Sequence, residues 1–340
     1  MKISNVASIV NTKIDASILT THTYISTECM LPNCGGIENC SSIPNGKVTS
    51  FDKNDILLSN IRPYFKKLWF STRSGGCSND VICLRVANRE CLPKYLYYAL
   101  CTDKFIDSFS ASSKGTKMPR GDKNALLAYE IPDRNIEDQL HIVDILGSID
   151  EKIENNEQEI RKINDLALCF IAKSNNLNTE LKPYIKFIKG KKPIENGSTT
   201  APYLSIDAII SFRYESVYSD DMIMATPFDI LMVMDGASSG TVFSHQAGVV
   251  SSTIAKIDCS DNIKDYLYWY LLSLKEIIKS RNTGSAIPHA NKEYISSLKF
   301  DYGFVEINIL HSLRTRIIQL QEENKKLQEL KGLYLKKFFE

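Results

Sequence analysis

The chain has 340 residues, of which 43% are hydrophobic, and its 41 Lys+Arg nearly balance its 40 Asp+Glu, giving a formal charge of +1. A chain of this size and composition can bury cores in about two or three domains, which excludes a disordered protein or a single small module. The net charge neither favours nor excludes a nucleic-acid partner, because phosphate binding depends on a local surplus of basic residues.

The start of the chain shows no export signal. The segment MKISNVASIVNTKIDASIL lacks an apolar core followed by a small-residue cleavage site, and no apolar run approaches the roughly 20 residues of a membrane span. We therefore expect a soluble, cytoplasmic protein with no membrane partner.

Nine cysteines are scattered along the chain without any CxxC pair. Structural zinc usually has ligands about two to four residues apart, and only Cys29, Cys34 and Cys40 come near that spacing. We expect reduced, packed thiols and no bound metal, and a zinc site at these three cysteines is the alternative.

Residues 1–135 predict a first domain that mixes strands and helices. From Phe51 to Val86, strand-like apolar stretches alternate with turn residues. The segment LPKYLYYAL, which begins at Leu92, predicts an aromatic helix. A loop rich in Gly and Pro and a final strand, both within SSKGTKMPRGDKNALLAYEIP, complete this domain.

A long helix follows from Ile136 to about Ala172, in a segment that we bound at residues 136–178. Steps of three and four residues alternate between its apolar positions, which predicts the seam of a coiled coil with charged flanks. The seam positions are Leu146, Ile149, Ile153, Asn156, Ile160, Ile163 and Ala167, of which Asn156 alone is polar.

Residues 179–303 repeat the first domain in the same order. The tripeptide DIL recurs, and IKDYLYWYL matches LPKYLYYAL. Gly284 matches Gly115 in the loop rich in Gly and Pro. Pro288 matches Pro119 at the same offset. A repeat of this length is a whole domain with its helix, unlike the short modules of solenoids, and predicts one binding device used twice.

A second long helix in residues 304–340 continues the alternation at Leu313, Ile317, Leu320, Asn324 and Leu327. A buried Asn costs stability unless it meets a polar partner, so a layer of Asn156 and Asn324 satisfies both amides and fixes the register. In an antiparallel pair the other layers then follow without adjustment: Ile153 with Leu327, Ile160 with Leu320, Ile163 with Ile317, and Ala167 with Leu313. In a parallel pair the two asparagines share no layer. The alternative is two unrelated, solvated helices.

The order of these segments resembles the DNA specificity subunit of type I restriction-modification systems over essentially the whole chain. The likeness rests on DIL, the Tyr/Leu helix, KGTKMPRGDKNALLAYEIP and IEDQLHIVDILGSIDEKI, and on their reprise in DILMVMDGASSG and TGSAIPHANKEYISSLKF. It implies an α/β fold: two α/β target-recognition domains in a tandem pseudo-twofold repeat, each followed by a long helix, with the two helices in an antiparallel coiled coil.

The resemblance also implies a function. Each recognition domain would read one half of a split, asymmetric site in double-stranded DNA, while the coiled coil sets the spacer and docks two methyltransferase subunits, with restriction subunits beyond them. S-adenosylmethionine is expected on the methyltransferase subunit, and we expect no cofactor on this chain.

Three basic stretches are candidates for contact with DNA, because Lys and Arg suit phosphates and guanine edges and Asn suits adenine. The loop of the first domain supplies Lys114, Lys117, Arg120 and Lys123, and the loop of the second supplies Arg281, His289, Asn291 and Lys292. A further group comprises Arg62, Lys66, Lys67 and Arg73, interleaved with Tyr64, Phe65, Trp69 and Phe70. The alternatives are a solvated charged face over aromatic core residues, and loops whose Gly and Pro serve only as turns.

The sequence lacks several common catalytic motifs. It contains no GxGxxG, GxxxxGK[ST] or HExxH, no Asn/Asp-Pro-Pro-aromatic motif of adenine methylation, and no metal-ligand spacing among its five histidines. We therefore expect a non-catalytic DNA-recognition subunit. A protein-protein adaptor with twin binding domains is the alternative, and an enzyme with an unrecognised site is a third hypothesis.

Overall fold

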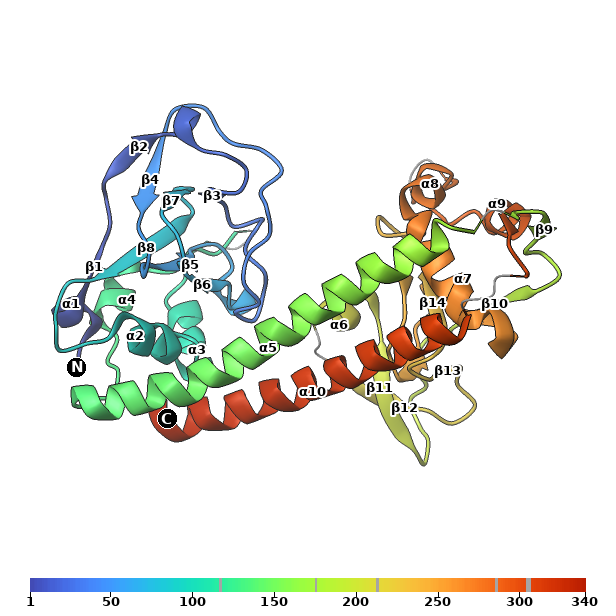
Figure 1. Cartoon of the computed structure of the whole chain (residues 1–340). Coiled ribbons are helices and arrows are strands. Elements are labelled where there is room, and N and C mark those ends of the chain that lie inside the picture. The colour runs from blue at the N-terminus through green and yellow to red at the C-terminus, as the bar shows by residue number, and fades with distance from the viewer. Residues whose placement is uncertain (116–117, 175, 212–213, 285–286, 304–306) are drawn as a thin grey trace. The chain divides into compact units, whose positions relative to one another are not determined.

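The computed structural model describes residues 1–115, 118–174, 176–211, 214–284, 287–303 and 307–340 (Figure 1). The chain divides into two compact units, one made of Met1–Lys152 with Lys326–Glu340 and the other of Ile153–Lys325. Each unit therefore combines one mixed α/β domain with one end of each long helix. No helix in the described ranges is long and apolar enough to cross a membrane.

The first unit holds two four-stranded sheets and several short helices. One sheet is antiparallel, in the order β1 (Ala7–Ile9), β8 (Val81–Val86), β5 (Ile56–Ser59) and β6 (Leu68–Phe70). The other has the order β2 (Lys13–Asp15), β4 (Lys47–Phe51), β7 (Gly75–Cys77) and β3 (Tyr24–Ile25), and only its β3–β7 pair is parallel. The helices are α1 (Ile3–Val6), η1 (Ala16–Ile18), η2 (Pro63–Phe65), α2 (Pro93–Leu100), α3 (Asp103–Ala111) and α4 (Lys123–Ala128).

The aromatic helix predicted after Leu92 is α2, and it forms the centre of the first core. Pro93 occupies its first turn, where a missing N–H costs nothing. Tyr95 and Tyr98 are fully buried, and residues from both long helices complete the same cluster. Each fully buried side chain of this size contributes about 1.5–3 kcal/mol through the hydrophobic effect, so the core holds the domain to the helix ends.

The second unit repeats this arrangement. Its first sheet has the order β10 (Ile185–Lys189), β17 (Ile254–Cys259), β14 (Ile230–Val233) and β15 (Val242–Phe243), and its second has the order β12 (Ser216–Tyr218), β11 (Thr200–Leu204), β16 (Gly248–Val250) and β13 (Met224–Ala225). A short pair joins β9 (Thr179–Glu180) to β18 (Lys299–Phe300). The helices are α6 (Ile206–Ser211), α7 (Asp261–Ser273), α8 (Lys275–Ser280) and α9 (Lys292–Ser297).

The strand pairing confirms the duplication and shows one difference between the copies. The sheet β1–β8–β5–β6 matches β10–β17–β14–β15 strand for strand. In the second sheets, β4–β7–β3 matches β13–β16–β11, because each trio has one antiparallel and one parallel pair. The fourth strand lies on opposite edges, since β2 pairs with β4 whereas β12 pairs with β11. The copies therefore share a frame but differ at the sheet edge.

The two long helices are α5 (Ile136–Ile171) and α10 (Ile307–Phe339), and they pack together as an antiparallel coiled coil (Figure 1). In the second unit, Asn156 Nδ2 donates to Asn324 Oδ1 over 2.8 Å, and Asn156 is 1% exposed. The predicted asparagine layer is therefore confirmed.

Other seam positions follow the same pattern. Ile163, Ala167, Ile317 and Leu320 are buried in one cluster, with Ile160 and Leu313 partly buried against it. The predicted layer of Ile153 and Leu327 joins residues assigned to different units and stays a prediction.

Two of the cysteines depart from the expectation of reduced thiols. Cys29 and Cys40 form a disulfide, with Cα atoms 5.2 Å apart. The intervening loop folds back and brings them within the distance that a disulfide requires, a proximity that their spacing does not reveal. The remaining seven cysteines are free, and no cluster that could hold a metal ion occurs within the described ranges.

Candidate nucleic-acid interface

The loop rich in Gly and Pro forms the same small hairpin in both units. In the first, Lys114 and Arg120 exchange two main-chain hydrogen bonds of 3.0 Å. In the second, Thr283 and His289 exchange bonds of 2.9 and 2.7 Å. The hairpin depends on its glycine, since Gly115 and Gly284 have φ angles of 101° and 89°, which favour a residue without a Cβ.

Each hairpin is attached to the chain that leaves the central strand of the first sheet. Ile61, after β5, pairs with Arg120, and Asp235, after β14, pairs with His289. These glycines and prolines therefore do serve as turns, as the alternative interpretation expects. The turns also place basic side chains at corresponding edges of the two domains.

The basic side chains of the first hairpin extend into solvent. The Lys114 side chain is 86% exposed, with Nζ 3.5 Å from Asp122. The Arg120 side chain is 58% exposed and its guanidinium lies 2.8 Å from Asp80. Lys123 is exposed in the first turn of α4. Lys117 lies outside the described residues.

The second hairpin uses its candidates differently. Arg281 lies over the ring of Tyr294, 5.6 Å from its centroid. Lys292 lies 5.9 Å from the ring centroid of Phe187. Asn291 caps α9, its Oδ1 accepting the N–H of Tyr294, which occupies the oxygen that an adenine contact would use.

His289 is linked to an acidic side chain that already has a lysine partner. Its Nδ1 lies 2.8 Å from Asp235, which also accepts a 2.7 Å hydrogen bond from Lys189. Partial burial opposes ionisation of Asp235, but the bonds from Lys189 and His289 lower its pKa below the ordinary value. The Asp235 charge therefore offsets part of the positive charge here.

The third group of candidates has four basic residues, of which three hold local structure and one extends into solvent. Lys66 forms a 2.8 Å ion pair with Asp103 and is 14% exposed. Lys67 donates to a main-chain carbonyl, and burial lowers its pKa. Arg73 donates to another carbonyl and lies over Trp69. Arg62 alone is exposed beside the hairpin, its N–H bonded to Pro119 O, and within the described ranges it has no ion pair.

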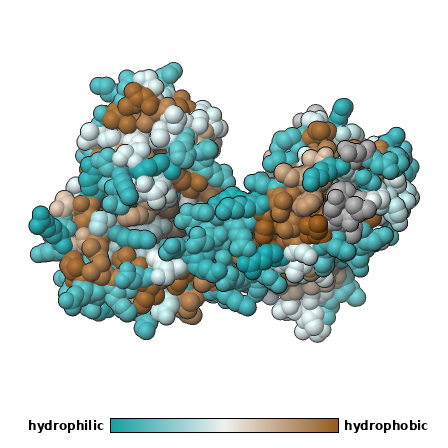
Figure 2. Space-filling view, in the orientation of Figure 1, coloured by the Kyte–Doolittle hydropathy of each residue, from teal (hydrophilic) through white to brown (hydrophobic). Residues whose placement is uncertain are grey.

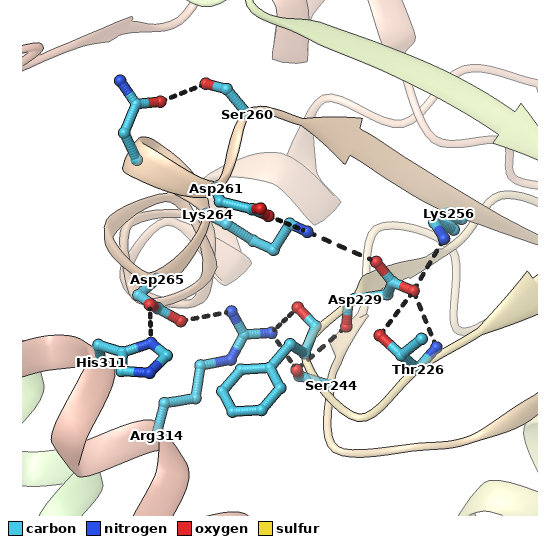
Figure 3. Close-up of polar contacts among 12 residues, drawn as sticks. Thr226, Asp229, Ser244, Lys256, Ser260, Asp261, Lys264, Asp265, His311 and Arg314 are labelled. Atoms are coloured by element: carbon cyan, nitrogen blue, oxygen red, sulfur yellow. Dashed lines mark hydrogen bonds and ion pairs between the residues drawn. The ribbon is translucent and has the colours of Figure 1, made fainter.

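The second domain is fixed to α10 by a buried arginine (Figure 3). Arg314 is fully buried, and its guanidinium donates to Asp265 over 2.9 Å, to the Phe228 carbonyl over 2.6 Å, and to Ser244. It also lies 4.8 Å from the ring centroid of Tyr268. Burial lowers the pKa of Arg314, and the Asp265 charge opposes that shift.

The first unit has a comparable link to α10. Lys331 is buried, and its Nζ lies 2.5 Å from Asp150, which also accepts a 2.8 Å hydrogen bond from Tyr98 of α2. Both links were missed from the sequence. Arg314 flanks the seam, where a charged residue usually faces solvent. Lys331 lies four residues after Leu327 and so continues the seam, and this position was the available signal.

The DIL aspartates are structural. Asp55 is 2% exposed and accepts hydrogen bonds of 2.8 and 2.7 Å from Arg85. Asp229 is 5% exposed and pairs with Lys256 at 2.8 Å (Figure 3). Burial opposes ionisation of Asp229, but the bonds from Lys256 and Thr226 lower its pKa. The repeated tripeptide therefore marks a buried carboxylate that pairs with a partly exposed basic side chain.

Parts of this chain resemble known proteins in sequence. Residues 20–165 match the family model described as the type I restriction modification DNA specificity domain. The type I restriction enzyme MjaVIII specificity subunit of Methanocaldococcus jannaschii is 35% identical over 125 residues, which cover 34% of this chain and 29% of that relative. The match thus spans less than a third of the relative's length.

One solved structure extends the likeness in fold to the whole chain. The S subunit of a type I restriction-modification system from M. genitalium matches with a TM-score of 0.56 at 19% identity, over 100% of this chain and 95% of that one. The HsdS subunit of Thermoanaerobacter tengcongensis covers the same shares, with a TM-score of 0.39 at 17% identity. Residues 20–165 therefore resemble a type I restriction modification DNA specificity domain, and the whole chain shares the fold of the M. genitalium S subunit.

Proposed function

We propose that this chain is a non-catalytic subunit in which each recognition domain reads one half of a split, asymmetric DNA site. The observation that carries the proposal is the doubled hairpin, which presents basic side chains at the same place on two sister domains. The side chains there differ between the copies, with Arg120 opposite His289 and Arg62 opposite Gly236. Different side chains present different patterns to base edges, so the two half-sites should differ in sequence.

The coiled coil supports a fixed spacer between the half-sites. Helices α5 and α10 have 36 and 33 residues, which at about 1.5 Å per residue rise about 50 Å. The major groove returns every 34–36 Å or so. A rod of this length suits half-sites about one turn or slightly more apart, with an unread sequence between them.

The outer faces of the helices support docking of the methyltransferase subunits. Large apolar side chains are exposed on α5 and α10, and Figure 2 shows hydrophobic patches on both units. The most exposed are Leu140, Leu166, Ile309 and Leu333, at 43–66%. Exposed apolar surface of this kind usually marks a protein interface. Two methyltransferase subunits, each carrying S-adenosylmethionine, would bind here in the cytoplasm, with restriction subunits beyond them.

The test is the affinity of the chain, co-purified with its methyltransferase subunit, for duplex DNA at increasing salt. Contacts with phosphates release counterions, so the logarithm of the binding constant should fall linearly with the logarithm of the salt concentration. Charge-reversing substitutions Lys114→Glu and Arg120→Glu should weaken binding and reduce this slope. Affinity that does not depend on salt would instead favour the protein-protein adaptor.

A further inference from the structure

A short turn in the first unit holds two aromatic side chains in solvent. Arg62 and Lys66 flank η2, and both have left-handed backbone angles, with φ of 48° and 54°. Residues with a Cβ seldom adopt this conformation, and such strain gathers at functional sites. Between them, Tyr64 and Phe65 are 50% and 41% exposed, with ring centroids 4.8 Å apart.

The second unit has the same turn at residues 236–240. Arg62 N–H donates to Pro119 O over 2.9 Å, and Gly236 N–H donates to Pro288 O over the same distance. The ends of the two turns are closed by matching bonds, from Ser59 N–H to Lys67 O and from Val233 N–H to Thr241 O. The main-chain hydrogen bonds therefore align the two turns residue by residue.

The two aligned turns differ in their side chains. Gly236 stands opposite Arg62, and Gly240 stands opposite Lys66, with φ angles of 102° and 86°. The second unit thus uses glycine at both left-handed positions. Residues 238–239, opposite the aromatic pair, are both serine. The second unit forms the same left-handed turn from small residues. The turn therefore does not require the aromatic and basic side chains that the first unit carries there.

The charges around the turn suit a polyanion. Arg62 is exposed, and the hairpin that binds its N–H carries the exposed side chains of Lys114 and Arg120. Lys66 is held by Asp103 and serves as an anchor for the turn. An aromatic pair bordered by basic side chains is the combination that meets bases and phosphates together.

We propose that the Arg62–Lys66 turn is a DNA contact possessed by the first recognition domain alone. Tyr64 and Phe65 meet the bases of the first half-site, where rings placed against a base step act as a wedge that loosens its stacking. Arg62 binds a neighbouring phosphate. This inference rests on the proposed function and deepens it, because it assigns to one domain a mode of reading that its sister lacks.

The test uses the complete chain co-purified with its methyltransferase subunit and a duplex that carries the motif methylated by the wild-type complex. The double substitution Tyr64→Ser and Phe65→Ser copies the second domain. We expect affinity for this duplex to fall at least about tenfold, a change of about 1.4 kcal/mol. We also expect a fluorescence rise of 2-aminopurine in the first half-site on binding, and its loss in the variant.

Two further variants separate DNA contact from folding. Arg62→Gly removes the exposed guanidinium but relieves the left-handed strain, so the melting temperature should stay or rise while affinity falls. Ser238→Ala, at the position opposite Tyr64, should leave affinity for both half-sites unchanged. A drop in melting temperature with unchanged affinity would give the turn a structural role and overturn the inference.

The other outcomes distinguish the inference from the proposed function. If the wild-type complex recognises a split motif and the serine variant binds it equally well, the inference fails and the proposed function stands. If the variant loses its methyltransferase subunit but keeps DNA affinity, the turn is a protein contact and the inference fails. If the wild-type complex has no motif and no salt-dependent DNA affinity, the proposed function fails, and the inference fails with it.

Discussion

The two recognition domains share a main-chain frame and differ in the side chains it carries. The hairpin, its left-handed glycine and its attachment to the central strand are the same in both. The nearby turn is Arg-Pro-Tyr-Phe-Lys in one and Gly-Ala-Ser-Ser-Gly in the other. The duplicated frame thus places corresponding positions at the same edge of each domain, and under the proposed function the side chains at these positions determine what each half reads.

The side chains that anchor the two domains to α10 also differ. The second unit uses the fully buried Arg314, whereas the first unit uses Lys331, which is 9% exposed. Replacing Arg314 with Ala removes the buried guanidinium from Asp265, which keeps only its contact with His311 among these partners, and should cost about 3–5 kcal/mol of unfolding free energy. Each unit contains one of the two tryptophans, Trp69 or Trp269, so urea unfolding followed in a Trp69→Phe background reports the second unit. The control is Arg316→Ala, on the same helix as Arg314. It removes the exposed ion pair between Arg316 and Glu159 and should change stability little. Equal effects of the two substitutions would refute the anchor.

The second unit should also be sensitive to acid. Burial, together with the nearby Arg314 charge, lowers the pKa of His245 to about 3. In the unfolded chain this pKa returns to about 6.5, so the unfolded state binds the proton first as pH falls. Unfolding free energy should therefore drop below about pH 6.5, by about 1.4 kcal/mol per pH unit, until about pH 3. Urea unfolding of the second unit at pH 7 and pH 5 measures this loss.

The variant His245→Asn is the control for this acid sensitivity, because Asn accepts the left-handed φ of 66° at this position. It should show a smaller difference between the two pH values. The same drop in the variant would contradict the assignment to His245.

The asparagine layer can be tested by removing one amide and then both. Asn156→Leu leaves the Asn324 amide without its partner and should cost about 1–3 kcal/mol. Replacing both asparagines with Leu should recover stability, because no unpaired amide remains. Thermal unfolding followed by circular dichroism compares the two. A double variant no more stable than the single one would argue against the paired layer.

The two hairpin glycines should respond unequally to alanine. A Cβ at Gly284 would lie 2.4 Å from the Ile287 carbonyl oxygen, whereas one at Gly115 would lie 3.5 Å from that of Met118. Gly115→Ala should cost about 1–2 kcal/mol for its left-handed backbone, and Gly284→Ala should cost more because of the clash. Melting temperatures of the two variants give the comparison, and an equal loss would show that the clash relaxes freely.

The sequence predicted what depends on periodicity and repetition. Seam spacing and the single polar position gave the antiparallel register of Asn156 and Asn324, and the constant offset of Gly115 and Gly284 gave the duplicated hairpin. These signals are local or repeated, so they can be read without knowing the fold.

What depends on long-range pairing could not be predicted. The sequence predicts that Lys66 contacts DNA, but its ammonium group pairs with Asp103, 37 residues further along the chain. The local sequence places Arg314 on the charged flank of the seam, where a solvated side chain is expected. It does not show that the guanidinium donates to Asp265 and to the Phe228 carbonyl. The bond between Cys29 and Cys40 likewise depends on a loop that folds back on itself.

The most direct test of the central claim, that two unlike domains read two unlike half-sites, is the map of methylated adenines in a host that expresses this chain with its methyltransferase subunit. We predict one motif made of two different short sequences separated by a gap of fixed length. A continuous motif, or two identical halves, would contradict the account.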